Sequence, residues 1–296
     1  MSSTSTRPVT VGLDGSRESL AAADWAAQEA VLRGLPLKLV NVWEPVPMAA
    51  RATFLGVESQ QHWVERVPRE AAEGVRARHG ELDVTIDQLT GRPGDVLPKV
   101  ADESALLVLG SRGLSSFGGF LVGSVGQAVL ATAQSPLVFV RAPEEGAGAE
   151  TADEGAGTVV LGLDANEPDD ALIRYAFEDA ERRGAALRVV HAWSLPPYFA
   201  YGLPPDPVLD AELEKQETAT LKEVLAPWRA KHPGVTVDEA PTIGKTADVL
   251  VAAAEGAALL VVGRRIRKAP FGGRIGSVAH AVLHHATSPV AVVPHA

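Results

Sequence analysis

Short apolar runs alternate with amphipathic stretches along the chain. In its first half, the runs with the length of a strand are Val9–Leu13, Leu37–Val42, Val84–Leu89, Leu106–Leu109 and Leu137–Val140. Between the first two, apolar residues recur at helical spacing, with Ser16 placed to cap the helix and Gly34 placed to end it. Further helices are predicted at Gln60–Arg78, Asp95–Ala101 and Ser124–Ala133. Near-continuous apolar strands that alternate with helices predict a parallel sheet covered on both faces.

The whole pattern occurs twice. Val9–Asp14 (VTVGLD) recurs at an offset of 150 as Val159–Asp164 (VVLGLD), and Gly123–Leu130 recurs at an offset of 153 as Gly276–Leu283. Residues 143–157 carry no large apolar side chain and are rich in glycine, alanine and acid, which is typical of a linker. We therefore predict domains at 1–142 and 158–296, joined by a linker at 143–157. In the second copy, we expect Pro168 in the first turn of the first helix.

Composition excludes several classes of protein. The net charge of -10 argues against broad binding to nucleic acid or to anionic membranes, and the absence of cysteine excludes disulfides and thiolate chemistry. The N-terminus has no apolar signal segment, and no apolar stretch approaches the roughly 20 residues that span a bilayer. We expect a cytoplasmic protein without nucleic-acid or membrane partners.

Glycine spacing marks a candidate site in the first copy, Gly110-x2-Gly113-x9-Gly123-Ser124. Gly110 follows a buried strand and Gly123-Ser124 opens a helix, whose unpaired N–H groups and positive dipole end favour a phosphate. Strand-to-helix loops also contain glycine without binding anything, so this pattern alone leaves both interpretations open. Ile243–Thr246 imitates the end of a Walker A loop, but Glu239 stands where its first glycine belongs, and we expect Thr246 to be an N-cap.

Asp14 at the end of the first strand, together with this glycine spacing in a duplicated chain, resembles the ATP-binding branch of the universal stress protein family. The resemblance covers both copies and implies two tandem Rossmann-like α/β domains, each a doubly wound, five-stranded parallel sheet. It implies that Asp14 contacts adenosine and that the backbone of Val42 lines the adenine pocket. It places Gly110, Gly113, Gly123, Ser124 and Val125 around the ribose and phosphates, and Gly12 and Arg112 join this set by position. Mg²⁺ on the phosphates is compatible with it, although no carboxylate cage is visible.

The second copy departs from the motif at one position. It reads Gly263-x2-Ile266-x9-Gly276-Ser277, with Ile266 where the first copy has Gly113. A β-branched residue is a poor fit where φ must be positive, which puts binding in this copy in doubt. Arg264, with Arg265, Arg267 and Lys268, either holds phosphates or balances an acidic surface. The matched candidate residues are Asp164, Ala192, Gly263, Arg264, Gly276, Ser277 and Val278.

The resemblance implies a nucleotide-binding regulator or sensor in stress. Two alternatives stay open, a slow ATPase or nucleotidyl-transfer enzyme and a nucleotide-free interaction scaffold. We assign no catalytic residue, because no nucleophile–base pair is evident. No metal site is assigned either, because His280 and His284 lack a third ligand. The two domains are expected to pack as a pseudo-dimer through Leu137–Val140 and Val290–Val293, and whole chains to form a homodimer.

Overall fold

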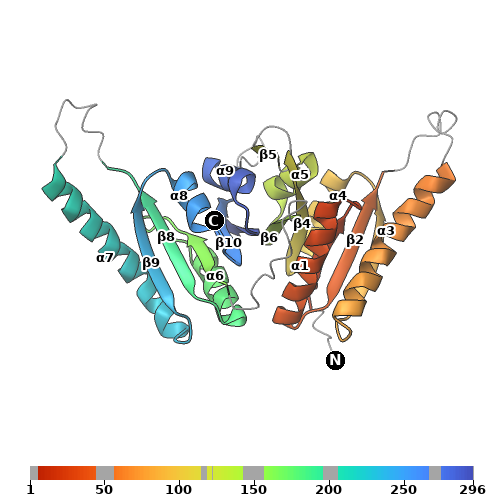
Figure 1. Ribbon diagram of the computed structural model, residues 1–296, viewed down its shortest axis with the longest axis horizontal. Helices are drawn as coiled ribbons and strands as arrows, with labels where there is room; N and C mark the ends of the chain where they lie inside the picture. Colours follow the sequence, from red (N-terminus) through yellow and green to blue (C-terminus); the bar gives the residue numbers. More distant parts are fainter. Residues whose placement is uncertain are drawn as a thin grey trace. The chain divides into compact units, whose positions relative to one another are not determined.

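A computed structural model describes residues 6–44, 57–114, 119–121, 123–142, 157–195, 206–266 and 275–295. The chain divides into two compact units, the first built from elements β1 to β6 and the second from β7 to β11 (Figure 1). Each is an α/β unit with a parallel sheet, which confirms the predicted tandem fold. The limits of the predicted linker stay a prediction, because residues 143–156 lie outside the described residues.

The sheet of the first unit has the strand order β3-β2-β1-β4-β6. These parallel strands are β1 (Val9–Leu13), β2 (Leu37–Trp43), β3 (Val84–Thr90), β4 (Leu106–Leu114) and β6 (Leu137–Arg141). The helices are α1 (Arg17–Arg33), α3 (Val57–Arg78), α4 (Pro93–Asp102) and α5 (Ser124–Thr132). The chain passes from β1 through α1 to β2 and through α3 to β3 in one direction along the sheet. It then runs in the opposite direction through α4 to β4 and through α5 to β6. Right-handed connections therefore put the two pairs on opposite faces.

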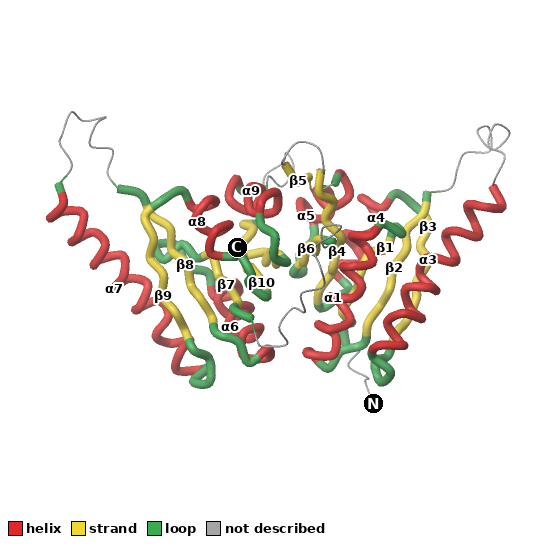
Figure 2. The backbone as a smooth tube through the Cα atoms, viewed as in Figure 1, coloured by secondary structure: helices red, strands yellow, loops and turns green. Residues whose placement is uncertain are grey.

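The second unit repeats this arrangement in the order β9-β8-β7-β10-β11 (Figure 2). Its strands are β7 (Val159–Gly162), β8 (Leu187–Trp193), β9 (Val237–Ile243), β10 (Leu259–Arg265) and β11 (Val290–His295). Its helices are α6 (Asp170–Arg183), α7 (Pro207–Lys231), α8 (Thr246–Ala253) and α9 (Ser277–His285). In both units the order of the strands reverses beside the first strand, which is where doubly wound sheets bind ligands.

Local chemistry explains the ends of the first helix in each unit. The Ser16 hydroxyl accepts from the Ser19 amide at 3.2 Å, and Gly34 ends α1 in the left-handed region at φ 62°, so both predictions are confirmed. Gly184 ends α6 with the same φ. Pro168, in contrast, lies outside α6. Asp169 caps this helix through its carboxylate, which accepts from two amides of the first turn, and the helix begins only at Asp170.

Two other predictions about element ends are wrong. Thr246 is the first residue of α8, and Lys245 is its N-cap. β4 does not end at Leu109 but continues to Leu114, because β6 pairs with its next two residues and a short antiparallel strand β5 (Gly119–Leu121) pairs with its last three. Gly119 therefore belongs to a strand rather than to a loop, and Gly118 lies outside the described residues.

The central strands carry the core. Leu106, Leu107 and Val108 of β4 are fully buried, as are Leu259, Leu260 and Val261 of β10, which accounts for the uninterrupted apolar runs in the sequence. In the part of the chain that the structure describes, no helix has the length and apolar character needed to cross a membrane.

Candidate functional site

The carboxyl ends of β1 and β4 meet at the point where the strand order of the first unit reverses. These strands pair in parallel register, Val9 with Leu106 and Val11 with Val108, so the residues after them share one edge. A hollow of about 220 Å³ opens there, and we call it the strand-end hollow. Its lining residues are Gly12, Leu13, Asp14, Ser16, Ser19, Leu109, Gly110, Gly123, Ser124, Val125 and Gly126.

The strand-end hollow brings together residues more than a hundred positions apart in the sequence. Gly12 and Asp14 come from the end of β1, Gly110 from β4, and Gly123 to Val125 from the start of α5. Of the described side chains, that of the predicted residue Val42 does not line it. Val42 lies in β2, while Arg112 and Gly113 lie in the β4 extension opposite Leu121 and Phe120 of β5.

Asp14 organises the turn that leads into α1. One of its carboxylate oxygens, Oδ1, accepts from the Ser16 amide at 3.0 Å and from the Ser16 hydroxyl at 2.5 Å. The Asp14 amide in turn donates to the Ser19 hydroxyl at 3.4 Å. The Asp14 side chain remains exposed at the hollow. It therefore holds the loop in shape and also presents an acceptor to whatever enters.

The N-terminus of α5 faces the hollow without a side-chain cap. Gly123 is the N-cap residue, with φ -57° and ψ 166°, and among the described residues no side chain caps the first-turn amides. A Cβ added at Gly123 would meet nothing within 4 Å, so the approach is open. Because helix amides in the first turn have no partner within the helix and carry the positive dipole end, this chemistry fits an anionic group such as a phosphate.

Close packing also accounts for two glycines of the hollow. A Cβ at Gly110 would stand 2.5 Å from the carbonyl carbon of Glu18 and 2.7 Å from the Ser19 amide nitrogen, so α1 rests directly on β4. A Cβ at Gly12 would stand 2.8 Å from a methyl group of Leu109. Glycine at these positions is therefore required by the fold before any ligand is considered.

The second unit keeps part of this arrangement. Oδ1 of Asp164 accepts from the Asn166 amide at 3.0 Å, as Asp14 does from Ser16. Gly276 caps α9 with φ -60° and ψ 147°, again without a side-chain cap and with open space around it. Ser277 and Val278 follow in the first turn. Both units therefore present an uncapped helix N-terminus and a strand-end aspartate.

The end of β10 differs from the end of β4. Arg265, which matches Arg112, donates to the Glu167 carboxylate at 2.5 Å, and this hydrogen bond raises the pKa of Arg265. Arg264 is only 5% exposed. Ile266 donates from its amide to the His295 carbonyl at 2.6 Å, and no described residue other than glycine has a positive φ. Ile266 is therefore unstrained, and the expected conflict with a positive φ does not arise. Arg267 and Lys268 lie outside the described residues.

Sequence reasoning missed a matched pair of buried polar residues. Asn41 of β2 donates from Nδ2 to the Leu13 carbonyl at 2.8 Å, and its Oδ1 is buried without a hydrogen-bond partner. Its counterpart His191 of β8 lies 3.0 Å from Glu217 of α7 through Nε2. The signal was present, because the repeat places a polar residue two positions before the strand-end tryptophan, within the apolar part of the strand, both times. Ala192, the counterpart of Val42, follows His191 in β8.

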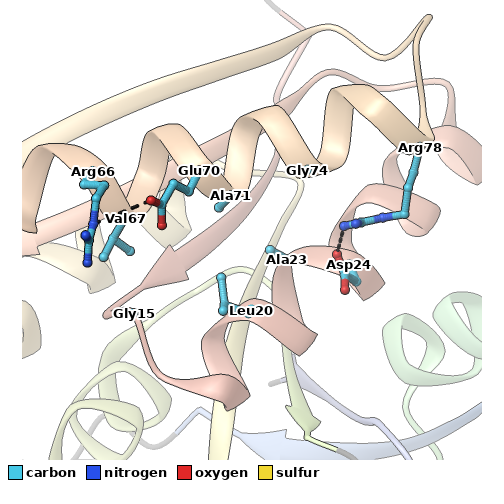
Figure 3. Close-up of a pocket in the computed structure, with 10 residues that line it drawn as sticks. All are labelled: Gly15, Leu20, Ala23, Asp24, Arg66, Val67, Glu70, Ala71, Gly74 and Arg78. Atoms are coloured by element: carbon cyan, nitrogen blue, oxygen red, sulfur yellow. Dashed lines mark hydrogen bonds and ion pairs between the residues drawn. The ribbon is translucent and has the colours of Figure 1, made fainter.

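A second hollow of about 350 Å³ lies between α1 and α3, and we call it the helix groove (Figure 3). Leu20, Ala23, Val67, Ala71 and Gly74 give it an apolar floor, with Leu20 pointing toward α3. Its charged rim is already paired, because Arg66 lies 3.6 Å from Glu70 and Arg78 bonds to Asp24. None of the predicted site residues whose side chains the structure describes lines this groove, although Gly15 joins its edge to the Asp14 loop.

α9 carries the histidine pair that was considered above as a metal site. His280 and His284 lie on the same side of α9 with ring centroids 4.2 Å apart. Within the described ranges, no group of three or more histidine, aspartate or glutamate side chains is arranged to hold a metal ion.

Comparisons with known proteins agree with the fold and its duplication. The model of the universal stress protein family matches residues 5–141 and again residues 156–294. A universal stress protein of Mycobacterium tuberculosis is 32% identical over 292 residues, covering 96% of each chain. One of Mycolicibacterium smegmatis is 31% identical over 292 residues, again with 96% coverage of each. The solved structure of a universal stress protein from Archaeoglobus fulgidus superposes with a TM-score of 0.70 at 18% identity, over 97% of this chain and 98% of that chain. The chain therefore belongs to the universal stress protein family, in a form with two family domains in tandem.

Proposed function

We propose that the first unit binds an adenine nucleotide, ATP in particular, in the strand-end hollow, and that the protein acts as a nucleotide-responsive regulator in stress. The observation that carries this proposal is the uncapped N-terminus of α5, which faces the exposed carboxylate of Asp14 across the same hollow. Donors for an anion and an acceptor for hydroxyl groups thus stand opposite each other, as a ribose–phosphate unit requires.

Each part of the hollow has a role in this proposal. The amides of Ser124 and Val125 hold phosphate oxygens, and the Ser124 hydroxyl adds a further donor. The exposed Asp14 carboxylate accepts from ribose hydroxyls while Ser16 holds the side chain in place. A volume of about 220 Å³ lies below the range of about 300 to 1,000 Å³ typical of ligand pockets, so the hollow seats the ribose and phosphates. The base would lie toward the end of β2, near Val42.

Regulation would follow from differential affinity. A ligand shifts a conformational equilibrium only by the difference between its affinities for the two states. The first turn of α5 and the β1–α1 loop both line the hollow, so a nucleotide that joins them would stabilise one arrangement of the site. Packing of the two domains through Leu137–Val140 and Val290–Val293, and pairing of whole chains, stay predictions.

Titration calorimetry with ATP tests the proposal. The Asp14→Ala variant loses a charge-assisted acceptor, so we expect roughly 10- to 100-fold weaker binding than in the unchanged protein. The control is Asp24→Ala, which removes another exposed carboxylate at the helix groove and is expected to leave ATP affinity unchanged. Circular dichroism verifies that both variants are folded. Absence of ATP binding by the unchanged protein at millimolar concentration would refute the proposed function.

A further inference from the structure

We infer that nucleotide binding is confined to the first unit. At the matching strand ends of the second unit, which we call its strand-end wall, carboxylates engage an arginine and a histidine of the same unit. This inference rests on the proposed function of the first unit. It concerns the segment between β7 and α6 and the ends of β10 and β11, since the N-terminus of α9 is open in the same way as that of α5.

Matched helix ends fix the correspondence between the two units. Gly34 and Gly184 terminate α1 and α6 with identical φ values of 62°. Their residue numbers differ by 150. Ser16, Arg17, Glu18 and Ser19 therefore correspond to Asn166, Glu167, Pro168 and Asp169. Because α1 begins at Arg17 and α6 only at Asp170, the first turn of α1 has no helical counterpart.

The lost turn changes the groups that a ligand would meet. In the first unit, Ser16 and Ser19 both line the strand-end hollow, so its α1 side is made of neutral hydroxyls. The counterpart of Ser19 is Asp169, and Glu167 stands where the first unit has Arg17. Of these two positions only Ser19 lines the strand-end hollow, so the second unit exchanges a hydroxyl of that lining for an anion, and Glu167 adds a second anion two residues earlier. Phosphate groups carry negative charge, so this wall repels the ligand that the first unit would attract.

A side chain fills the space that the lost turn leaves. In the first unit, Gly110 rests on the backbone of Glu18 and Ser19. In the second, the imidazole of His295 takes that place, and its Nε2 lies 2.7 Å from where a Cβ of Gly263 would stand. The other ring nitrogen, Nδ1, is 3.7 Å from the Asp169 carboxylate. His295 corresponds to Ala142, so nothing equivalent fills this place in the first unit.

The arginine at the end of β10 is also engaged. Glu167 holds Arg265 at 2.5 Å, with both side chains at least half exposed. Exposed pairs of this kind are weak, so the pair by itself would not exclude a nucleotide. Its effect adds to that of Asp169 and His295, because all of them belong to the same wall. In the second unit, Arg265 and His295 are therefore already paired with carboxylates of the same unit.

Native mass spectrometry with ATP counts the bound nucleotides. At an ATP concentration that just saturates the unchanged protein, we expect one nucleotide per chain there and a strongly reduced occupancy in Asp14→Ala, whereas Asp164→Ala keeps one. Two per chain in the unchanged protein would overturn this inference and leave the proposed function intact. None per chain would overturn both, so the two failures are distinguishable.

A graft tests the cause. We would replace Asn166→Ser, Glu167→Arg, Pro168→Glu and Asp169→Ser, which installs the loop of the first unit, together with His295→Ala. A second nucleotide per chain is expected. The matched control is Asp238→Ala, which releases Arg188 from a comparably exposed pair and should stay at one. A folded graft that still binds one nucleotide would overturn the assignment of this wall as the cause.

The reverse graft covers the case in which that variant does not fold. Ser19→Asp alone places one carboxylate in the strand-end hollow of the first unit at a helical position. We expect at least 10-fold weaker ATP binding, with Ser19→Ala affected much less because it adds no charge. Equal affinities of the two variants would overturn the electrostatic explanation.

Discussion

The two units share a strand order and differ in how they fill the space around it. On the strand-end edge, the first unit uses the backbone of a helical turn where the second uses His295 and two carboxylates. On the helical layer, α1 presents Ala23 and Ala27, whereas α6 has Ile173 and Phe177 at the matching positions. The comparison teaches that the sheet determines where a site can lie, and that a few loop and helix residues determine whether it is open.

The helical layer gives the largest expected effect. Phe177 is fully buried, and its ring centroid lies 6.2 Å from that of Trp228 and 5.5 Å from that of His232. Phe177→Ala should lower the free energy of unfolding of the second unit by about 3 to 5 kcal/mol, since it leaves a cavity where the ring packed beside Trp228 and His232. Chemical denaturation measures this loss.

The control for that change is Val208→Ala, because Val208 is 80% exposed at the start of α7. Its unfolding free energy should stay within about 0.5 kcal/mol of the unchanged protein. A loss below about 1 kcal/mol for Phe177→Ala would show that the layer can collapse onto the smaller side chain, as α1 does with its alanines.

The strand-end glycines give an intermediate effect that differs between the units. Gly110→Ala drives a methyl group into the backbone of Glu18 and Ser19, so we expect a loss of stability of about 3 kcal/mol. Gly263→Ala meets the His295 ring instead, a side chain that can move, and should cost about 1 kcal/mol. Thermal unfolding of the two variants compares them directly. Equal losses would mean that the His295 ring is as rigid as a helical turn.

The exposed ion pair gives the smallest effect. Glu167→Gln removes the carboxylate that raises the pKa of Arg265. Both side chains are exposed and their attraction is screened by salt, so the melting temperature should not change measurably at physiological ionic strength. A scan at low salt measures the residual attraction. A clear drop at physiological salt would show that the pair also holds the 164–169 segment in shape.

Much of this architecture is predictable from sequence because the sheet is buried on both faces. Runs such as Leu106–Leu109 must then be apolar throughout, and their repetition at offsets of 150 and 153 identifies the second unit. The caps of α1, Ser16 and Gly34, are equally predictable, since capping depends on residues close in sequence. The order of strands and the meeting of Asp14 with Gly110 follow from the same doubly wound pattern.

What sequence does not show depends on partners distant along the chain. The polar, glycine-rich residues after Leu109 have the composition of a loop, but β6 and then β5 pair with them, so they form a strand. α6 begins after Asp169 and does not include Pro168, because the Asp169 carboxylate accepts hydrogen bonds from two amides of the first turn. Gly110 and Gly263 are the same residue in the same motif. Only the structure shows that one faces backbone and the other an imidazole.

The choice of Gly123 as the cap of α5 has a consequence for the lifetime of the protein. A helix without a side-chain cap is incomplete until something else satisfies its first amides. Under the proposed function, the nucleotide phosphates accept hydrogen bonds from these amides. A ligand present at 100 times its dissociation constant adds about 2.7 kcal/mol to the stability of the folded state. When cellular ATP falls, the folded fraction of the first unit falls with it, and proteases remove more of the chain. The abundance of the protein would then record the energy supply of the cell without any signalling partner.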